Sequence, residues 1–158
     1  LSLDKAQQVL VDSFSGSAYD LRLKLWLNLL FFNQELFHYC GLAFTEWLNG
    51  SFATSKTHPA DVDVVCFFKP ELVQISRQVD ETERLFYFFA TEHTTSRAKL
   101  DLAIDAYLVL DYSHLEETDP ARQAYEQERL YWRDWFGIAS TGESKAIIEL
   151  NLEADELS

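Results

Sequence analysis

Several residue types are scarce in this 158-residue chain. The two cysteines, Cys40 and Cys66, are too few for a disulfide framework and lack the spacing of a zinc site. Both lie among apolar residues, which indicates buried thiols in a reducing compartment, so we expect a cytoplasmic protein. The most apolar run, residues 25–32, is interrupted by Asn28 and is too short to span a bilayer. Methionine is absent and the chain begins at Leu1, so we expect further residues to precede it.

Basic residues are also scarce, since 13 lysines and arginines stand against 26 aspartates and glutamates, for a net charge of −13. A surface this acidic repels phosphate backbones, and no local basic patch is visible, which argues against general nucleic-acid binding. A small nucleotide carried with a metal ion remains compatible with this charge. The hydrophobic content of 47% suits a globular domain, because a chain of this length can bury a real core.

The apolar periodicity predicts one α+β domain over residues 1–158, with a helical segment within about residues 1–40. An acidic tail at residues 153–158 is expected to fray. The order of elements predicts a mixed sheet of about four strands, covered mainly on one face by helices. The expected strands are 42–48, 62–68, 102–110 and 146–150, and the expected helices are 18–39, about 70–91, a short one capped by Thr94 or Thr95, and 119–136.

Three aspartates at the predicted strands are the most unusual feature of the sequence. Asp61 and Asp63 stand two positions apart where the strand at residues 62–68 begins, so their side chains point the same way about 7 Å apart. Asp105 lies inside an apolar strand, where a lone carboxylate is costly unless it is paired or binds a metal. If the two strands are neighbours, the three acids converge and can hold one or two Mg²⁺ or Mn²⁺ ions through oxygen ligands.

A short polar loop precedes these acids and offers groups that bind phosphate. Gly50 lets the backbone approach a phosphate closely, and the Ser51 hydroxyl and nearby N–H groups can bind its oxygens. Lys56, in the same loop, and Lys145, at the start of the last strand, are further candidates for phosphate contact. Two metal ions at the three acids would activate an attacking hydroxyl and stabilise a leaving pyrophosphate.

Each of these residues also has a plainer interpretation. Asp61 follows His58-Pro59-Ala60 and is compatible with a turn, and Asp63 is compatible with a solvent-facing position on an edge strand. Asp105 could be balanced by a buried arginine or tyrosine, and Lys145 could be solvated. The combination of these residues in this order is more specific than any one of them.

Three aromatic residues end the helix predicted over residues 119–136. Trp132, Trp135 and Phe136 are expected to pack against the sheet. The alternative for them is stacking on a base.

Gly50-Ser51, Asp61-x-Asp63 and Asp105 resemble the signature of the DNA polymerase β-type nucleotidyltransferase superfamily. The stretches "FTEWLNGSFATSKTHPADVDVVCFF", "DAYLVL" and "YWRDWFGIASTGESKAIIEL" further resemble a group of small bacterial nucleotidyltransferase-like proteins, over roughly residues 13–150. The resemblance implies the polymerase β-like nucleotidyltransferase fold. It implies that the three aspartates are metal ligands, that Asp105 is also the base, and that Gly50 and Ser51 hold a triphosphate.

The function implied by the resemblance is Mg²⁺-dependent transfer of a nucleoside monophosphate from a nucleoside triphosphate to a hydroxyl of a protein, small molecule or RNA end. The chain departs from the superfamily by having Thr54-Ser55-Lys56 where a second glycine is often found, and by lacking an obvious second domain for the acceptor. The alternative implied by the same resemblance is an antitoxin or interaction module paired with a HEPN-type ribonuclease toxin, with little or no turnover.

Overall fold

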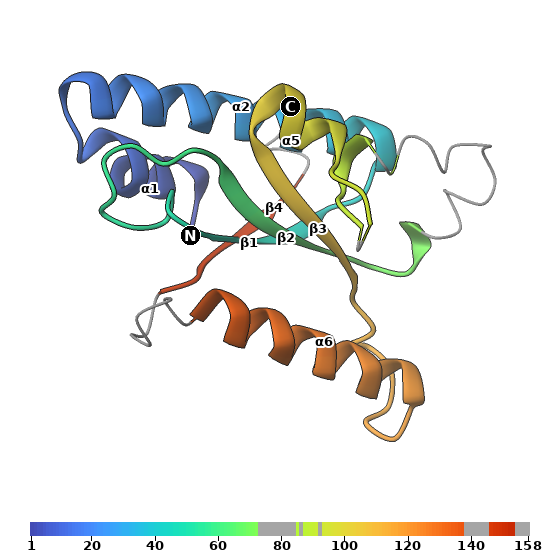
Figure 1. Cartoon of the computed structure of the whole chain (residues 1–158). Coiled ribbons are helices and arrows are strands. Elements are labelled where there is room, and N and C mark those ends of the chain that lie inside the picture. Colours follow the sequence, from blue (N-terminus) through green and yellow to red (C-terminus); the bar gives the residue numbers. More distant parts are fainter. Residues whose placement is uncertain (73–84, 86, 92, 138–145, 154–158) are drawn as a thin grey trace.

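A computed structural model describes residues 1–72, 85, 87–91, 93–137 and 146–153. Within these residues a four-stranded sheet lies between helices, as Figure 1 shows. The strand order is β3-β2-β1-β4, in which β2 and β3 are parallel and β1 is antiparallel to both β2 and β4. The strands are β1 (Phe44–Asn49), β2 (Val62–Phe68), β3 (Ile104–Leu110) and β4 (Ile148–Leu152).

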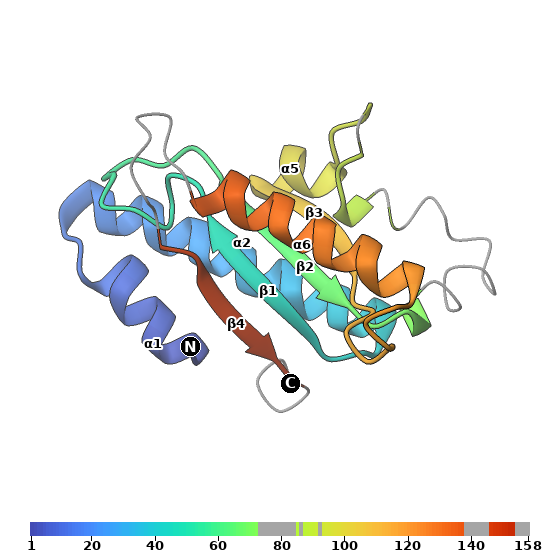
Figure 2. The ribbon, with the colours of Figure 1, turned by 90° about the horizontal axis from the view of Figure 1, so that it is seen from below.

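The predicted α+β class and the four-stranded mixed sheet are confirmed, and so is the adjacency of the strands that carry Asp63 and Asp105. The prediction of helices mainly on one face holds for α1 (Leu3–Gln7), the π-helical turn η1 (Gln8–Asp12), α2 (Gly16–Cys40) and α5 (Arg97–Leu102). The exception is α6 (Pro120–Gly137), which lies across the opposite face, so the sheet is covered on both sides (Figures 1 and 2).

Local hydrogen bonding explains where the prediction of the third strand was wrong. Residues 97–102 form α5 because the Ser96 hydroxyl accepts a hydrogen bond from the Lys99 backbone N–H at 3.1 Å and caps the helix. The cap is therefore neither Thr94 nor Thr95, the two expected residues, and Thr94 pairs with Thr91 in an isolated bridge. Ala103 then ends the helix in the left-handed conformation, with φ of 59°, and the strand begins one residue later.

Other predicted boundaries moved by a few residues. The last strand begins at Ile148 rather than at residue 146, and the first begins at Phe44 rather than at residue 42. The helix expected over about residues 70–91 falls largely outside the described residues, as does most of the acidic tail. No helix in the described parts of the chain is both long and apolar enough to cross a membrane.

Alternation along the strands divides the apolar residues into two cores. Val62, Val64 and Cys66 of β2 face α2, while Val65 and Phe67 face α6. The core beneath α2 is the larger one, and the long helix fills it with Leu, Phe and Trp side chains over nearly its whole length. Asp63 belongs to the same set of alternating positions as Val65, so it points to the α6 side of the sheet.

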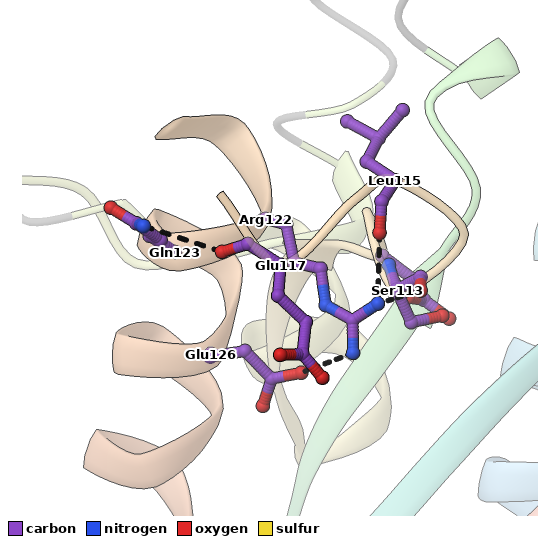
Figure 3. A network of polar contacts seen from close by, with 7 residues as sticks. Ser113, Leu115, Glu117, Arg122, Gln123 and Glu126 are labelled. Atoms are coloured by element: carbon purple, nitrogen blue, oxygen red, sulfur yellow. Dashed lines mark hydrogen bonds and ion pairs between the residues drawn. The ribbon is translucent and has the colours of Figure 1, made fainter. Parts of the chain in front are cut away.

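The connection that leads from β3 to α6 is held by one arginine (Figure 3). The Arg122 guanidinium donates hydrogen bonds to the carbonyls of Ser113 and Leu115, both at 2.8 Å. Gln123 adds a hydrogen bond from its side-chain amide to the Glu117 carbonyl at 3.3 Å. Because these bonds occupy the carbonyls of the loop, the chain reverses compactly and α6 returns across the sheet.

Candidate metal centre

The three predicted aspartates come together at one end of β2 and β3. Asp63 stands directly opposite Asp105 in the parallel pairing, and Asp61 lies one residue before β2. One carboxylate oxygen of each residue lies within 4.8 Å of those of the other two. Because β2 is flanked by β1 and β3, Asp63 is on an interior strand, and the interpretation of a solvent-facing residue on an edge strand was wrong.

Gly50 lies directly against the Asp63 carboxylate. Asn49, the last residue of β1, pairs with Asp63, and the next residue, Gly50, turns with φ of +69°. A Cβ at this position would stand 1.6 Å from Oδ2 of Asp63, so no other residue fits without displacing that carboxylate. The Gly50 turn therefore lies against the strand that carries Asp63, and Ser51 follows in the half-buried turn.

A buried arginine of α2 holds the loop between Gly50 and Asp61 in place through hydrogen bonds. Arg22 of α2 is fully buried, and its guanidinium donates hydrogen bonds to the carbonyls of Phe52 at 2.8 Å, Thr54 at 2.6 Å and Lys56 at 3.0 Å. A fourth bond, to the Leu10 carbonyl at 2.7 Å, ties in η1. The loop thus has a defined path because one planar cation satisfies several of its carbonyls.

A lysine from α5 lies among the carboxylates. Lys99 Nζ forms an ion pair with Oδ2 of Asp105 and lies 3.4 Å from Oδ2 of Asp61. Burial alone would lower the pKa of Lys99, but its hydrogen bond and charge interactions with Asp105 and Asp61 outweigh burial and raise it above 10.5. The lysine is therefore charged at neutral pH. The residue that compensates the charge of Asp105 is therefore a lysine, where the plainer interpretation named a buried arginine or tyrosine.

Aromatic residues of α6 extend away from the acids on the same face of the sheet. Tyr107, two positions after Asp105, lies 4.5 Å from the Trp132 ring, centroid to centroid. Burial, followed by the negative charge of Asp105, raises the pKa of Tyr107. Phe136 is buried, so the prediction that it packs in the core is confirmed. The same prediction was wrong for Trp135, whose exposed fraction is 67%.

The end of α6 is tied to the same place. The Asn49 side-chain amide donates a 2.6 Å hydrogen bond to the Phe136 carbonyl, close to the C-terminus of the helix. The Asn49 carboxamide oxygen in turn accepts a hydrogen bond from the Gly50 N–H. This residue therefore links α6 to the turn that lies against Asp63.

Comparison with known proteins identifies a family. The sequence profile of a family of unknown function, DUF6932, matches residues 1–151. The chain belongs to the DUF6932 family. No curated protein and no solved structure matches it.

The DUF6932 chain presents a donor set that suits a hard divalent cation. All three side chains offer carboxylate oxygens, which Mg²⁺ and Mn²⁺ prefer, and they converge from two adjacent strands rather than from one flexible loop. The side chains of Asp61 and Asp105 are 29% and 11% exposed, so solvent reaches the cluster from one side.

Not every predicted site residue is brought to these acids. The side chain of Lys56 is exposed to solvent. Its backbone carbonyl accepts a hydrogen bond from Arg22. Lys145 lies outside the described residues, so its predicted role in phosphate contact stays a prediction.

Sequence reasoning missed Lys99, Arg22 and Asn49. A signal existed for Arg22, because its spacing from Trp26 and Leu29 places it on the apolar face of α2, where a charge needs buried partners. Lys99 had no such signal, because its helix is short and its partners are set by the packing of α5 beside β3.

Proposed function

We propose that this protein is a metal-dependent nucleotidyltransferase of the polymerase β type, which transfers a nucleoside monophosphate from a nucleoside triphosphate to a hydroxyl group. The observation that supports the proposal most is the convergence of Asp61, Asp63 and Asp105 within 4.8 Å beside the Gly50 turn, where an added Cβ would meet the Asp63 carboxylate. In-line displacement at phosphorus requires positioning and charge stabilisation more than covalent help, and this arrangement offers both.

The roles of the residues follow from their places in the cluster. Asp61 and Asp63 would hold Mg²⁺ or Mn²⁺ together with Asp105, and one or two ions bound there would stabilise the charge of the leaving pyrophosphate. Asp105 lies deepest and would orient the attacking hydroxyl or accept its proton. Gly50 lets the backbone of the turn approach the triphosphate, and the Ser51 hydroxyl would donate to a phosphate oxygen.

The proposal is tested by incubating the protein with Mg²⁺ or Mn²⁺ and each nucleoside triphosphate, labelled at the α-phosphate. Pyrophosphate release and transfer of label to protein, RNA ends or small hydroxyl compounds are measured. Asp63→Asn should abolish both signals. Asp12→Asn, which makes the same charge change at an exposed position on η1, should not. Equal turnover in wild type and Asp63→Asn would contradict the proposal.

A second candidate function is an interaction module with little or no turnover, such as the partner of a HEPN-type toxin. One observation favours it: α6 exposes three large apolar side chains, Leu130, Tyr131 and Trp135, by 45%, 56% and 67%. Co-expression with the products of the neighbouring genes, followed by titration of the purified pair, tests this function. Trp135→Ser should weaken such a complex, and unchanged affinity would count against a role for α6.

A further inference from the structure

Lys99 places a positive charge on the oxygens that the proposed function assigns to a metal ion. Its ammonium group contacts Oδ2 of Asp105 and lies 3.4 Å from Oδ2 of Asp61. Both acids belong to the cluster of three whose oxygens lie within 4.8 Å. A divalent cation bound to the same oxygens would therefore lie too close to the ammonium for both to remain, since like charges this near repel strongly.

The position of Lys99 is determined by the fold rather than by chance at the surface. Ser96 caps α5, Ala98 is completely buried against the main core, and Ala103 ends the helix in a left-handed conformation. The Asn28 side chain of α2 also donates a 2.8 Å hydrogen bond to the Leu102 carbonyl. With both ends of α5 held, the side chain of Lys99 is only 34% exposed and is directed at the acids.

A lysine side chain is suited to pairing with carboxylates that another cation can later bind. Its ammonium is a compact charge on a flexible four-carbon stem, so it can leave two carboxylates by rotating without moving the helix. The planar fork of an arginine would hold a carboxylate in fixed bidentate geometry and would be displaced less readily.

We propose that Lys99 is a built-in counter-ion of the three-aspartate cluster that a divalent cation must displace, so that Lys99 lowers the affinity of the site for the free ion. This inference rests on the proposed function, because it takes the aspartates as metal ligands. Without an ion, Lys99 relieves the repulsion among three adjacent carboxylates. When an ion arrives with phosphate groups, the displaced ammonium gains a new anionic partner. Lys99 thereby favours the ion–polyphosphate complex over the ion alone.

Titration of the full chain with Mn²⁺, followed by the electron paramagnetic resonance signal of the free ion, tests the inference without any assay of turnover. Lys99→Met should bind Mn²⁺ about fivefold more tightly than wild type, the effect expected from the loss of a competing ion pair. Lys24→Met makes the same change in net charge at an exposed position of α2 and should bind as wild type does. Lys99→Arg should not bind more tightly than wild type. If Lys99→Met does not fold, as judged by circular dichroism, Lys99→Gln takes its place.

Calorimetric titration of the protein with the preformed complex of Mn²⁺ and inorganic tripolyphosphate tests the preference for the ion–polyphosphate complex. The advantage of Lys99→Met over wild type should disappear or reverse, and an undiminished advantage would overturn the preference for the ion–polyphosphate complex. Equal Mn²⁺ affinities in wild type, Lys99→Met and Lys24→Met would overturn the competition while leaving the proposed function standing. Absence of Mn²⁺ binding in all three would overturn the proposed function itself, and this inference with it.

Discussion

The sheet carries carboxylates on both of its faces, and the two sides neutralise them in different ways. On the α6 side, Asp61, Asp63 and Asp105 meet a lysine, and one side of the cluster is open to solvent. On the α2 side, Glu46 of β1 is completely buried and has no cation beside it among the described residues. The Asn33 amide donates to its Oε2 at 3.1 Å, and the Cys66 thiol lies 3.8 Å from Oε1.

This contrast shows which carboxylates are suited to exchange ligands. Burial raises the pKa of Glu46 to about 8, against a smaller lowering by the Asn33 hydrogen bond, so Glu46 is protonated and uncharged at neutral pH. A protonated Glu46 is a hydrogen-bond donor beside Asn33, whose Oδ1 has no partner within the described parts of the chain. Asp61 and Asp105 instead lie against the Lys99 ammonium, a position that a competing cation can take.

The largest expected effect comes from removing the buried charge that holds the loop of the site. Arg22→Met should reduce the free energy of unfolding by about 3–4 kcal/mol, because four backbone carbonyls lose a charged donor. Urea denaturation measures this change. Arg133→Met, at an exposed position on α6, is the control and should change stability by less than about 0.5 kcal/mol. A comparably small change for Arg22→Met would show that the loop does not depend on it.

Glu46→Gln tests whether the buried glutamate is uncharged in the folded protein. Between about pH 4.5 and 8 the unfolded Glu46 loses its proton while the folded one keeps it, so the unfolded state binds fewer protons and wild-type stability falls as pH rises. The glutamine side chain does not titrate, so the free energy of unfolding of the variant does not fall in this way. The difference between variant and wild type in free energy of unfolding should therefore rise by about 2–3 kcal/mol from pH 5 to pH 7.

Urea denaturation at several pH values gives that difference, with Glu35→Gln at an exposed position of α2 as the control. Parallel stability curves for wild type and Glu46→Gln would mean that Glu46 is charged in the folded protein. The buried and open carboxylates would then not differ in the way described.

Gly50→Ala tests how closely the turn lies against the open cluster. The variant should lose about 2 kcal/mol of stability, because the left-handed conformation is strained for alanine and the new Cβ collides with Asp63. It should also lose Mn²⁺ affinity. Gly16→Ala is a matched control, since Gly16 has φ of +58° but nothing within 4 Å of an added Cβ. Equal Mn²⁺ affinity in both variants would show that the Gly50 turn does not affect metal binding.

The smallest expected effect is the response to the ion itself. Mn²⁺ at ten times its dissociation constant should stabilise the wild type by about 1.4 kcal/mol, which raises the melting temperature by about 3–6 °C. The double variant Asp61→Asn and Asp63→Asn should show no such rise, because two of the three charged ligands are gone. Calorimetry with and without Mn²⁺ measures both. A double variant that still gained stability would place the ion elsewhere.

The sequence was sufficient for those features that depend on nearest neighbours along the chain. The continuous apolar run at residues 62–68 identified β2 to the residue, and the two-residue spacing of Asp61 and Asp63 placed both beside the same strand end. Gly50 and Gly41 have positive φ, at the turn after β1 and at the end of α2, where glycine is the residue that adopts this conformation most easily. These are local properties of the backbone and of side-chain periodicity, so the order of residues alone determines them.

The tertiary structure decided which partner each charge meets. Asp105 lies opposite Asp63 only because β3 pairs in parallel with β2 in this register, and Lys99 reaches both acids only because α5 is held beside β3. Glu46 and Arg22 acquire their environments from segments 12 to 34 positions away along the chain. Charge compensation is a property of distance in space, which falls outside any local pattern. The sequence therefore determined where Asp61, Asp63 and Asp105 lie relative to their strands. The packing determined that Asp61 and Asp105 meet Lys99 and that Glu46 is buried without a cation among the described residues.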